Sequence, residues 1–153
     1  MTPDEIRSTV DALQSRTVQG EEDAWQRLKS LGIEVVPYLL QAYPKFKTSQ
    51  GRVSLVFHSV RFARVSEHAV QLALLALNDR ATLVRYRACG LLAYSLRRDV
   101  LPHLKALKSH QDAKTAEDAT AAIDTIRSRN HHFFIDRSHS GRITWEINDE
   151  DRN

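Results

Sequence analysis

Residues 136–141, Asp-Arg-Ser-His-Ser-Gly, place oxygen-bearing side chains at alternate positions before a glycine, as loops that bind calcium do. Such a loop also needs a bidentate glutamate at its twelfth position. That position holds Ile147, and Glu146 is displaced from it by one residue. We therefore expect residues 136–147 to form a turn between two extended runs, with calcium binding as the alternative.

The other candidates for metal binding or nucleophilic chemistry are His131, His132, His139 and Cys89. Neighbouring residues of a strand point to opposite faces, so His131 and His132 cannot both bind one ion, and we interpret all three histidines as surface residues. Cys89 lies in a strongly apolar segment, where a buried thiol is unreactive. We expect no metal site.

No catalytic motif accompanies these residues. The sequence contains neither a glycine-rich phosphate loop nor a nucleophile elbow, and it has no Cys-x-x-Cys pair. We therefore predict that the chain is not an enzyme, that it needs no cofactor and that it takes no small-molecule substrate.

Positive charge is concentrated in the middle of the chain. Residues 45–110 contain twelve Lys and Arg against three Asp and Glu, a net charge of +9, whereas residues 1–44 and 111–153 each carry −3. A basic block in a folded segment attracts an anionic surface. The candidate partner-binding residues are Arg52, His58, Arg61, Arg64, Arg87, Tyr94 and Arg98.

Helices must position these side chains, because apolar residues recur at helical spacing along most of the chain. The pattern predicts eight helices, at about 3–17, 21–31, 34–43, 50–64, 67–77, 81–96, 99–109 and 114–129. They repeat in pairs after about 30 residues, which is typical of a helical-hairpin solenoid. Each pair alone leaves an apolar face exposed, so stacking the pairs buries the core.

The stretch from Leu74-x-x-Leu77-Asn-Asp79 to Val84-Arg85-x-x-Ala88, followed by Asp99-Val-Leu-Pro-His-Leu, resembles HEAT repeats. The resemblance is specific for residues 68–108 and weak before residue 32. It implies an α-solenoid whose second helices line a concave face. It also implies a structural ladder between repeats, formed here by Asp79 and Arg85.

The sequence changes character after residue 130. Residues 131–147 contain two alternating, β-rich runs around Ser-His-Ser-Gly, which predicts a β-hairpin packed on the last helices as a cap. Residues 148–153 are acidic, and we expect them to be frayed. The predicted organisation is a helical repeat domain over 1–130, a hairpin over 131–147 and a tail over 148–153.

The composition fits one soluble domain, with 153 residues, 42% of them hydrophobic and 27% charged. The sequence has no apolar run near the roughly 20 residues needed to span a bilayer, and it does not start with an apolar signal. With a single cysteine, the chain is expected to be cytoplasmic and to have no membrane partner.

Three functions compete. The first is a protein-binding module that grips an anionic patch, and small HEAT-like chains of this size resemble bacterial immunity proteins, including those of contact-dependent growth-inhibition systems, which neutralise a toxin domain. The second is a nucleic-acid binder that resembles HEAT-like DNA-repair proteins with a basic groove. The third is an enzyme of the HEAT-like bilin lyase type, for which the sequence offers only the fold.

Overall fold

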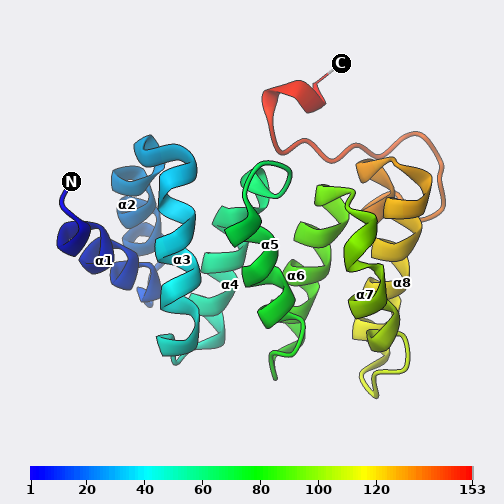
Figure 1. Ribbon diagram of the computed structural model, residues 1–153, viewed down its shortest axis with the longest axis horizontal. Coiled ribbons are helices and arrows are strands. Elements are labelled where there is room, and N and C mark those ends of the chain that lie inside the picture. The colour runs from blue at the N-terminus through cyan, green and yellow to red at the C-terminus, as the bar shows by residue number, and fades with distance from the viewer. Residues whose placement is uncertain (153) are drawn as a thin grey trace.

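The computed structural model describes residues 1–152, and the secondary structure in this range consists of helices alone. The α-helices are α1 (Pro3–Asp11), α2 (Val18–Leu28), α3 (Val36–Ala42), α4 (Ser49–Ser59), α5 (Glu67–Ala76), α6 (Thr82–Ser95), α7 (Leu101–Leu107) and α8 (Ala113–Ser128) (Figure 1). Short 3₁₀ helices are η1 (Ala12–Gln14), η2 (Lys29–Val35), η3 (Tyr43–Lys45), η4 (Val60–Phe62), η5 (Arg98–Val100), η6 (His131–Phe134) and η7 (Asp149–Asp151). The eight predicted helices are confirmed.

Local chemistry fixes where several helices begin. The hydroxyls of Thr17, Thr48 and Ser66 each accept a hydrogen bond from the backbone N–H three residues later, at the starts of α2, α4 and α5. Proline occupies the first turn of α1, α3 and α7, where its missing N–H costs nothing. Short connections then bring consecutive helices back antiparallel.

The helices form two layers that stack into a solenoid. In one layer α1 packs on α3 and α3 on α5, and in the other α4 packs on α6 and α6 on α8. Each repeat is closed by contacts between its own two helices, as in the pairs α3–α4, α5–α6 and α7–α8 (Figure 1). This is the predicted helical-repeat arrangement, with the second helices forming one continuous layer.

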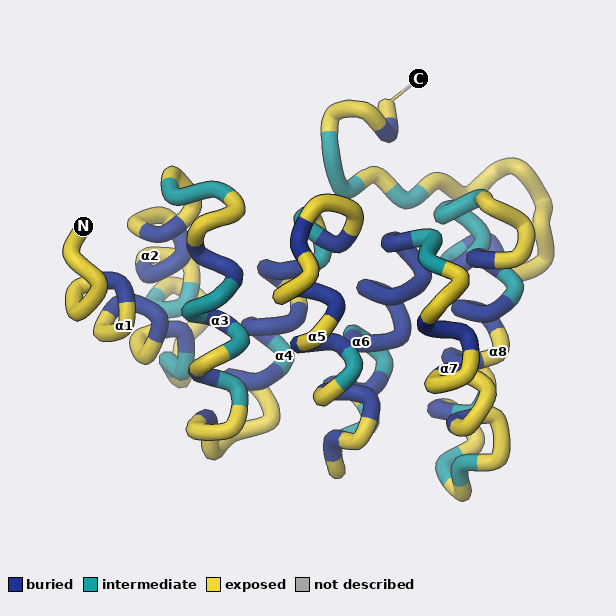
Figure 2. The backbone as a smooth tube through the Cα atoms, in the orientation of Figure 1, coloured by how far each residue is buried: buried dark blue, intermediate teal, exposed yellow. Residues whose placement is uncertain are grey.

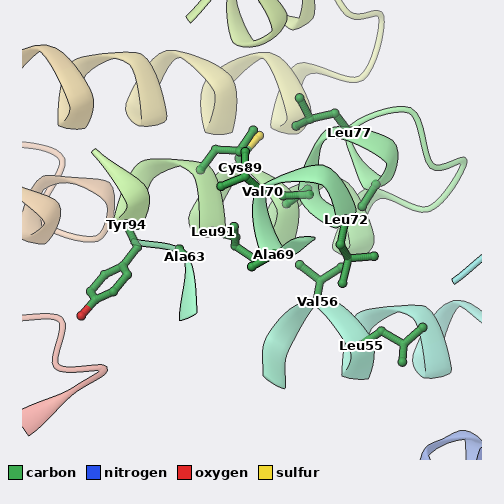
Figure 3. Close-up of a cluster of buried hydrophobic side chains, with 14 of the residues drawn as sticks. Leu55, Val56, Ala63, Ala69, Val70, Leu72, Leu77, Cys89, Leu91 and Tyr94 are labelled. Atoms are coloured by element: carbon green, nitrogen blue, oxygen red, sulfur yellow. The ribbon is translucent and has the colours of Figure 1, made fainter. Parts of the chain in front are cut away.

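Apolar side chains between the layers form one core. Leu55 and Val56 of α4, Leu72 of α5, and Leu91 and Leu92 of α6 are fully buried. Figure 3 shows side chains from these three helices converging on one cluster, and Figure 2 shows burial running along the facing sides of the helices while the turns are exposed. Cys89 also lies in this core, and burial raises the pKa of its thiol to about 12. The cysteine is therefore unreactive, as expected.

A ladder of ion pairs joins neighbouring repeats, but its partners differ from the prediction. Asp79 pairs with Arg52 rather than with Arg85: Arg52 donates from Nε to Asp79 Oδ2 at 2.7 Å and from Nη2 to Oδ1 at 3.2 Å. Arg85 instead donates from Nη2 to Asp112 Oδ2 at 2.8 Å, and from Nη1 to the backbone oxygen of Asp79 at 2.7 Å. Each arginine thus reaches the aspartate one repeat further along the chain.

The spacing of the ladder residues shows the length of the repeat. Arg52 and Arg85 are 33 residues apart, and so are Asp79 and Asp112. The next arginine position holds Asp118, whose side chain is fully buried. Arg137 from the C-terminal segment compensates this charge by donating from Nη2 to Asp118 Oδ1 at 3.0 Å. The last repeat is therefore completed by the segment that follows it.

The predicted C-terminal β-hairpin is wrong, because residues 131–152 contain no strand. Residues 131–134 form η6, and the chain then runs back across the ends of α8 and α6 toward α4 (Figure 1). A two-stranded hairpin is marginally stable, whereas packing Phe134, Trp145 and Ile147 directly on the solenoid buries more apolar surface. Residues 148–151 are also ordered rather than frayed, since they form η7 and Asp151 is buried. Asn153 lies outside the described residues.

Candidate partner-binding face

The exposed side of α4 and α6, turned away from α3 and α5, carries a small apolar groove of about 60 Å³, which we call the Arg87 groove. Its lining includes Phe57 and Val60 near the end of α4, Tyr86 and Arg87 of α6, and Trp145 and Ile147 of the C-terminal segment. Phe57 is 44% exposed, which is unusual for a large aromatic side chain in a domain with a full core.

Arg87 has the most informative environment in this groove. Its guanidinium carbon lies 5.0 Å from the ring centre of Phe57 and 5.5 Å from that of Tyr86. The Nε atom is buried and has no hydrogen-bond partner among the described residues. Cation–π contacts hold such a side chain in place, yet they leave a polar donor unsatisfied. The guanidinium is therefore prepared for an anion that the chain itself does not supply.

A glycine opens the space that the C-terminal segment fills. Gly90 of α6 stands 33 residues after Phe57, at the equivalent position of the next repeat. A Cβ atom at Gly90 would lie 3.2 Å from Phe134 and 3.6 Å from Trp145. The missing side chain thus allows two aromatic rings from after α8 to pack directly on the α6 backbone.

A second groove of about 250 Å³ lies beside the first, between α2 and α4, and Phe57 lines both. Trp25 and His58 stack at its base, with ring centres 4.1 Å apart and planes 13° from parallel. The guanidinium of Arg61 lies 5.7 Å from the Trp25 ring centre. The face therefore presents two arginines, exposed Arg61 and half-buried Arg87, beside aromatic rings of the second helices.

His58 links α4 to α2 through Glu21, whose Oε1 lies 2.8 Å from His58 Nε2. Burial lowers the pKa of His58 below its ordinary value of 6.5, and this effect outweighs the hydrogen bond to Glu21. Burial and the neighbouring His132 likewise lower the pKa of His131. Both imidazoles are therefore neutral in the folded protein at neutral pH.

These two histidines make the fold sensitive to mild acid. A histidine whose folded pKa is depressed binds its proton more tightly in the unfolded chain, so stability falls as the pH drops through 6.5. We expect the free energy of unfolding to decrease from about pH 7.5 to about pH 5.5. Urea titrations at both pH values should show less decrease in His58→Gln. The exposed His68→Gln should behave like wild type, and an equal decrease in all three proteins would contradict the assignment.

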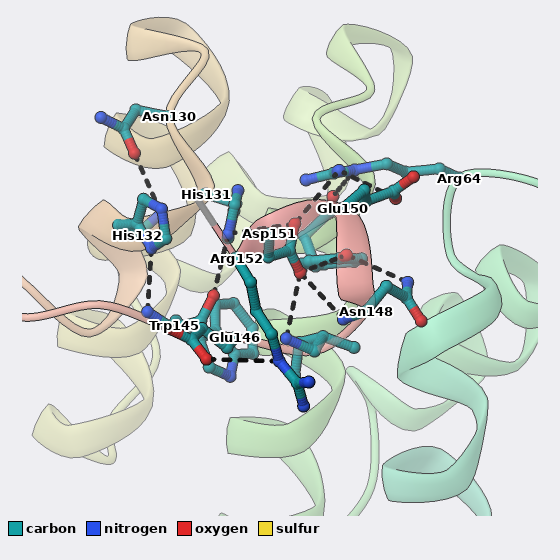
Figure 4. A network of polar contacts seen from close by, with 12 residues as sticks. Arg64, Asn130, His131, His132, Trp145, Glu146, Asn148, Glu150, Asp151 and Arg152 are labelled. Atoms are coloured by element: carbon teal, nitrogen blue, oxygen red, sulfur yellow. Dashed lines mark hydrogen bonds and ion pairs between the residues drawn. The ribbon is translucent and has the colours of Figure 1, made fainter.

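Arg64 and Tyr94 hold the end of the chain, and we call them, with Asp151, the clasp. The Tyr94 hydroxyl donates to Asp151 Oδ2 at 2.7 Å, and the Arg64 guanidinium lies 4.0 Å from the Tyr94 ring centre (Figure 4). Arg64 Nη1 lies 3.9 Å from Asp151 Oδ1. The N–H groups of Ile147 and Asn148 also donate to Asp151, each at 3.0 Å.

Two consecutive histidines fasten Trp145 beside the clasp. His131 Nε2 lies 2.9 Å from the Trp145 carbonyl oxygen, and the Trp145 N–H donates to His132 Nδ1 at 2.8 Å (Figure 4). The prediction that these side chains point to opposite faces fails because residues 131–134 are helical, not extended. Their rings lie 4.0 Å apart and serve the C-terminal segment rather than a metal ion.

Asp136 belongs to a turn. Its carboxylate accepts hydrogen bonds from the N–H and hydroxyl of Ser140, at 3.1 and 2.8 Å, and from the N–H of Gly141 at 2.8 Å. The Ser140 hydroxyl in particular lowers the pKa of Asp136. Both oxygens are thus engaged by the chain. Within residues 1–152, no group of three or more His, Cys, Asp or Glu side chains is arranged to hold a metal ion.

The structure separates the predicted partner-binding residues into three groups. Arg61 and Arg87 lie on the exposed face of the second helices. Arg52, His58 and Tyr94 are buried beneath this face. Arg64 is engaged in the clasp, and Arg98 lies in η5, on the connection from α6 to α7.

Sequence reasoning missed the aromatic half of this face. None of Phe57, Trp25 and Trp145 is among the partner-binding residues predicted from the sequence. The 33-residue repeat contains one sequence signal for this packing: Gly90, at the position equivalent to Phe57, leaves space for another aromatic ring. Nothing in the local sequence shows that Trp145 is that ring.

The sequence matches no family model and no curated protein sequence. Among solved structures, the chain is similar to human deoxyhypusine hydroxylase in complex with glycerol, with a TM-score of 0.66 over 82% of this chain and 44% of that chain. The sequences are 19% identical, so the likeness shows the fold alone. This chain spans less than half the length of that protein. The predicted HEAT-like helical-repeat fold is confirmed.

The same comparison corrects the prediction that the chain is not an enzyme. That prediction rested on missing catalytic motifs, whereas the hydroxylase is an enzyme built on a similar fold. The helical-repeat fold therefore does not exclude catalysis. Within the described residues, no helix is both long and apolar enough to cross a membrane.

Proposed function

We propose that this chain binds a protein partner through the exposed face of α2, α4 and α6. The observation that carries the proposal is Arg87, a guanidinium held against Phe57 and Tyr86 whose Nε is buried without a hydrogen-bond partner. An arginine already ordered and partly desolvated loses little entropy on binding and gains a strong, charge-assisted hydrogen bond. A carboxylate of the partner would pair with the terminal nitrogens of this guanidinium, which are not buried and have no hydrogen-bond partner among the described residues either.

The surroundings of Arg87 favour a protein over a free anion. Exposed Phe57 and half-buried Val60 lie next to the guanidinium, and Trp25 and Arg61 continue the same face. Arginine, tryptophan and tyrosine dominate binding energy at protein interfaces when they surround an apolar centre. The partner that fits is a protein surface with an apolar side chain between two carboxylates.

More specifically, we propose that the chain is an immunity-type protein that neutralises a toxin domain by covering it. Support comes from the small helical-repeat fold and from an exposed face that combines apolar anchors with unpaired cations. A cytoplasmic location, where a toxin would have to be neutralised, is part of this proposal. A nucleic-acid partner is the alternative, because arginines beside aromatic rings also bind phosphates and bases.

The test compares two variants that lose one positive charge each. The protein captured by the wild-type chain in its native host is identified, and its Kd is measured at physiological salt. Arg87→Met keeps the apolar stem over the rings but removes the charge, and it should weaken binding by about 1.5–3 kcal/mol, roughly tenfold to a hundredfold. Lys105 of α7 is exposed on the other layer, so the Lys105→Met variant should bind the partner as tightly as wild type does.

Several outcomes decide between the proposals. Equal Kd values for Arg87→Met and wild type would contradict the assigned face. A steep linear fall of log affinity with log salt, together with recovery of nucleic acid, would replace the protein partner by a nucleic acid. For the immunity role, the captured protein must inhibit growth when produced alone, and co-production of wild type, but not of Arg87→Met at matched levels, must restore growth.

A further inference from the structure

The segment that carries Asp151 is joined to the solenoid by an exposed connection. Every residue from Arg137 to Thr144 is exposed, and this stretch contacts the solenoid through Arg137, which pairs with Asp118, and His139, which pairs with Asp124. From Ser140 to Thr144 no side chain forms a hydrogen bond or ion pair with the described helices, and the chain is held again at Trp145. The last ordered residues are held mainly by side chains, through His131, His132 and the clasp, and not by strand or helix pairing with the solenoid. A short segment fixed in this way opens at a lower free energy than the core does.

Within the clasp, Asp151 is bound as a ligand would be. Its side chain is 2% exposed, accepts a hydrogen bond from the Tyr94 hydroxyl of the solenoid and lies 3.9 Å from Arg64, while the N–H groups of Ile147 and Asn148 in its own segment also donate to it. Asn148 adds a hydrogen bond from its side-chain amide to the Arg61 carbonyl oxygen at 3.0 Å. Arg64 and Tyr94 belong to the solenoid, so they form a preorganised binding site for a carboxylate.

The bound segment also borders the partner face. Trp145 and Ile147 form one side of the Arg87 groove, and Asn148 reaches Arg61 in η4. Between Trp145 and Asp151 the chain carries four acidic residues and no Lys or Arg, and it lies next to Arg61, Arg64 and Arg87. The segment therefore has the chemistry that the proposed function assigns to the partner: apolar anchors followed by carboxylates.

We propose that the clasp is a binding site for an acidic protein segment, and that residues 143–152 are its built-in ligand, which a partner segment of the same chemistry displaces. The displacement step rests on the proposed function, whereas the clasp as a binding site does not. Displacement exposes the walls formed by Arg64 and Tyr94 and widens the Arg87 groove. A partner with an apolar pair four to six residues before a carboxylate then binds in the place of Trp145, Ile147 and Asp151.

The experiment uses the full chain and a fluorescent peptide with the sequence of residues 143–152. A tethered segment competes at an effective concentration of about millimolar, so wild type should bind the peptide only weakly. Asp151→Asn loosens the built-in segment and should bind the same peptide on the order of tenfold more tightly. Adding Arg64→Met to Asp151→Asn should abolish this gain, and a peptide carrying the Asp151→Asn change should not bind.

Hydrogen exchange provides the readout for displacement. The amides of Ile147 and Asn148 should be protected in wild type, exchange faster in Asp151→Asn, and lose protection when the captured partner is added. Equal peptide affinity of wild type and Asp151→Asn, or no binding to either, overturns the clasp. Unchanged amide protection in the presence of the partner overturns displacement. These results are independent of the Arg87→Met measurement, so each proposal can fail while the other stands.

Discussion

Asp79→Ala should lower the free energy of unfolding by about 3–5 kcal/mol, because it leaves a buried arginine without its counter-ion. The side chains of Arg52 and Asp79 are only 9% and 4% exposed. Asp79 also accepts hydrogen bonds from the Tyr43 hydroxyl at 2.5 Å and from the Ala81 N–H at 2.9 Å. One substitution therefore strands three donors at the junction between two repeats.

Asp112→Ala is the comparison within the same ladder. Asp112 occupies the equivalent position, but its side chain is 28% exposed, so water replaces part of what Arg85 loses. The expected loss is therefore clearly smaller than that of Asp79→Ala. Urea titrations with unchanged slopes measure both effects. If Asp79→Ala lowers the free energy of unfolding no more than Asp112→Ala does, burial of the Arg52–Asp79 pair is not the main cause of the loss.

A double substitution separates the stranded charge from lost packing. Arg52→Met together with Asp79→Leu removes both charges and leaves apolar groups in their place, which is often neutral for buried pairs. It should recover most of the stability lost in Asp79→Ala. A double variant as unstable as the single one would show that the loss comes from Tyr43 and the turn at Ala81.

Phe134→Ala should cost about 3–5 kcal/mol, the usual range for removing a fully buried phenylalanine. Phe134 is 1% exposed and packs on Gly90 of α6, on Trp145 at a ring-centre distance of 5.5 Å, and on Tyr86 at 5.6 Å. Its loss removes the ring on which the C-terminal segment lies. Thermal and urea unfolding measure the cost, and hydrogen exchange at Ile147 and Asn148 should accelerate.

The adjacent Phe133→Ala is the matched control. Phe133 is half-buried and stacks on the exposed His139 at a ring-centre distance of 3.7 Å. We expect a loss below about 1 kcal/mol, because this ring leaves no cavity in the core. Comparable losses for the two substitutions would mean that the segment after α8 is not anchored through Phe134.

The eight helices could be predicted from the sequence because the information is local. Apolar residues recur at helical spacing, and threonine, serine or proline marks several starts, so each helix is specified by residues within a few turns of itself. The pairing of helices repeats along the chain for the same reason. Arg61 and Arg87 were also found, since they occur on second helices of the basic block.

The ladder partners required the tertiary structure. Asp79 lies six residues from Arg85 and 27 from Arg52, and the resemblance to HEAT repeats favoured the nearer arginine. In the stacked repeats the Arg52 side chain reaches the Asp79 carboxylate directly, while Arg85 reaches its backbone oxygen. Two arginines of equal chemistry were available, and only the spacing between helices decided which carboxylate each one binds.

The C-terminal segment shows the same division more sharply. The alternation in residues 131–147 is a valid strand pattern, but a strand also needs a partner for its backbone groups. Here the side chains of His132 and Asp151 accept hydrogen bonds from the N–H groups of Trp145 and Ile147, and Gly90 leaves space for the aromatic rings. The sequence by itself determined helices, repeat and charge, because these depend on neighbours along the chain. Only the tertiary structure decided the ion-pair partners, the Arg87 groove and the clasp, because these depend on distances between residues far apart in sequence.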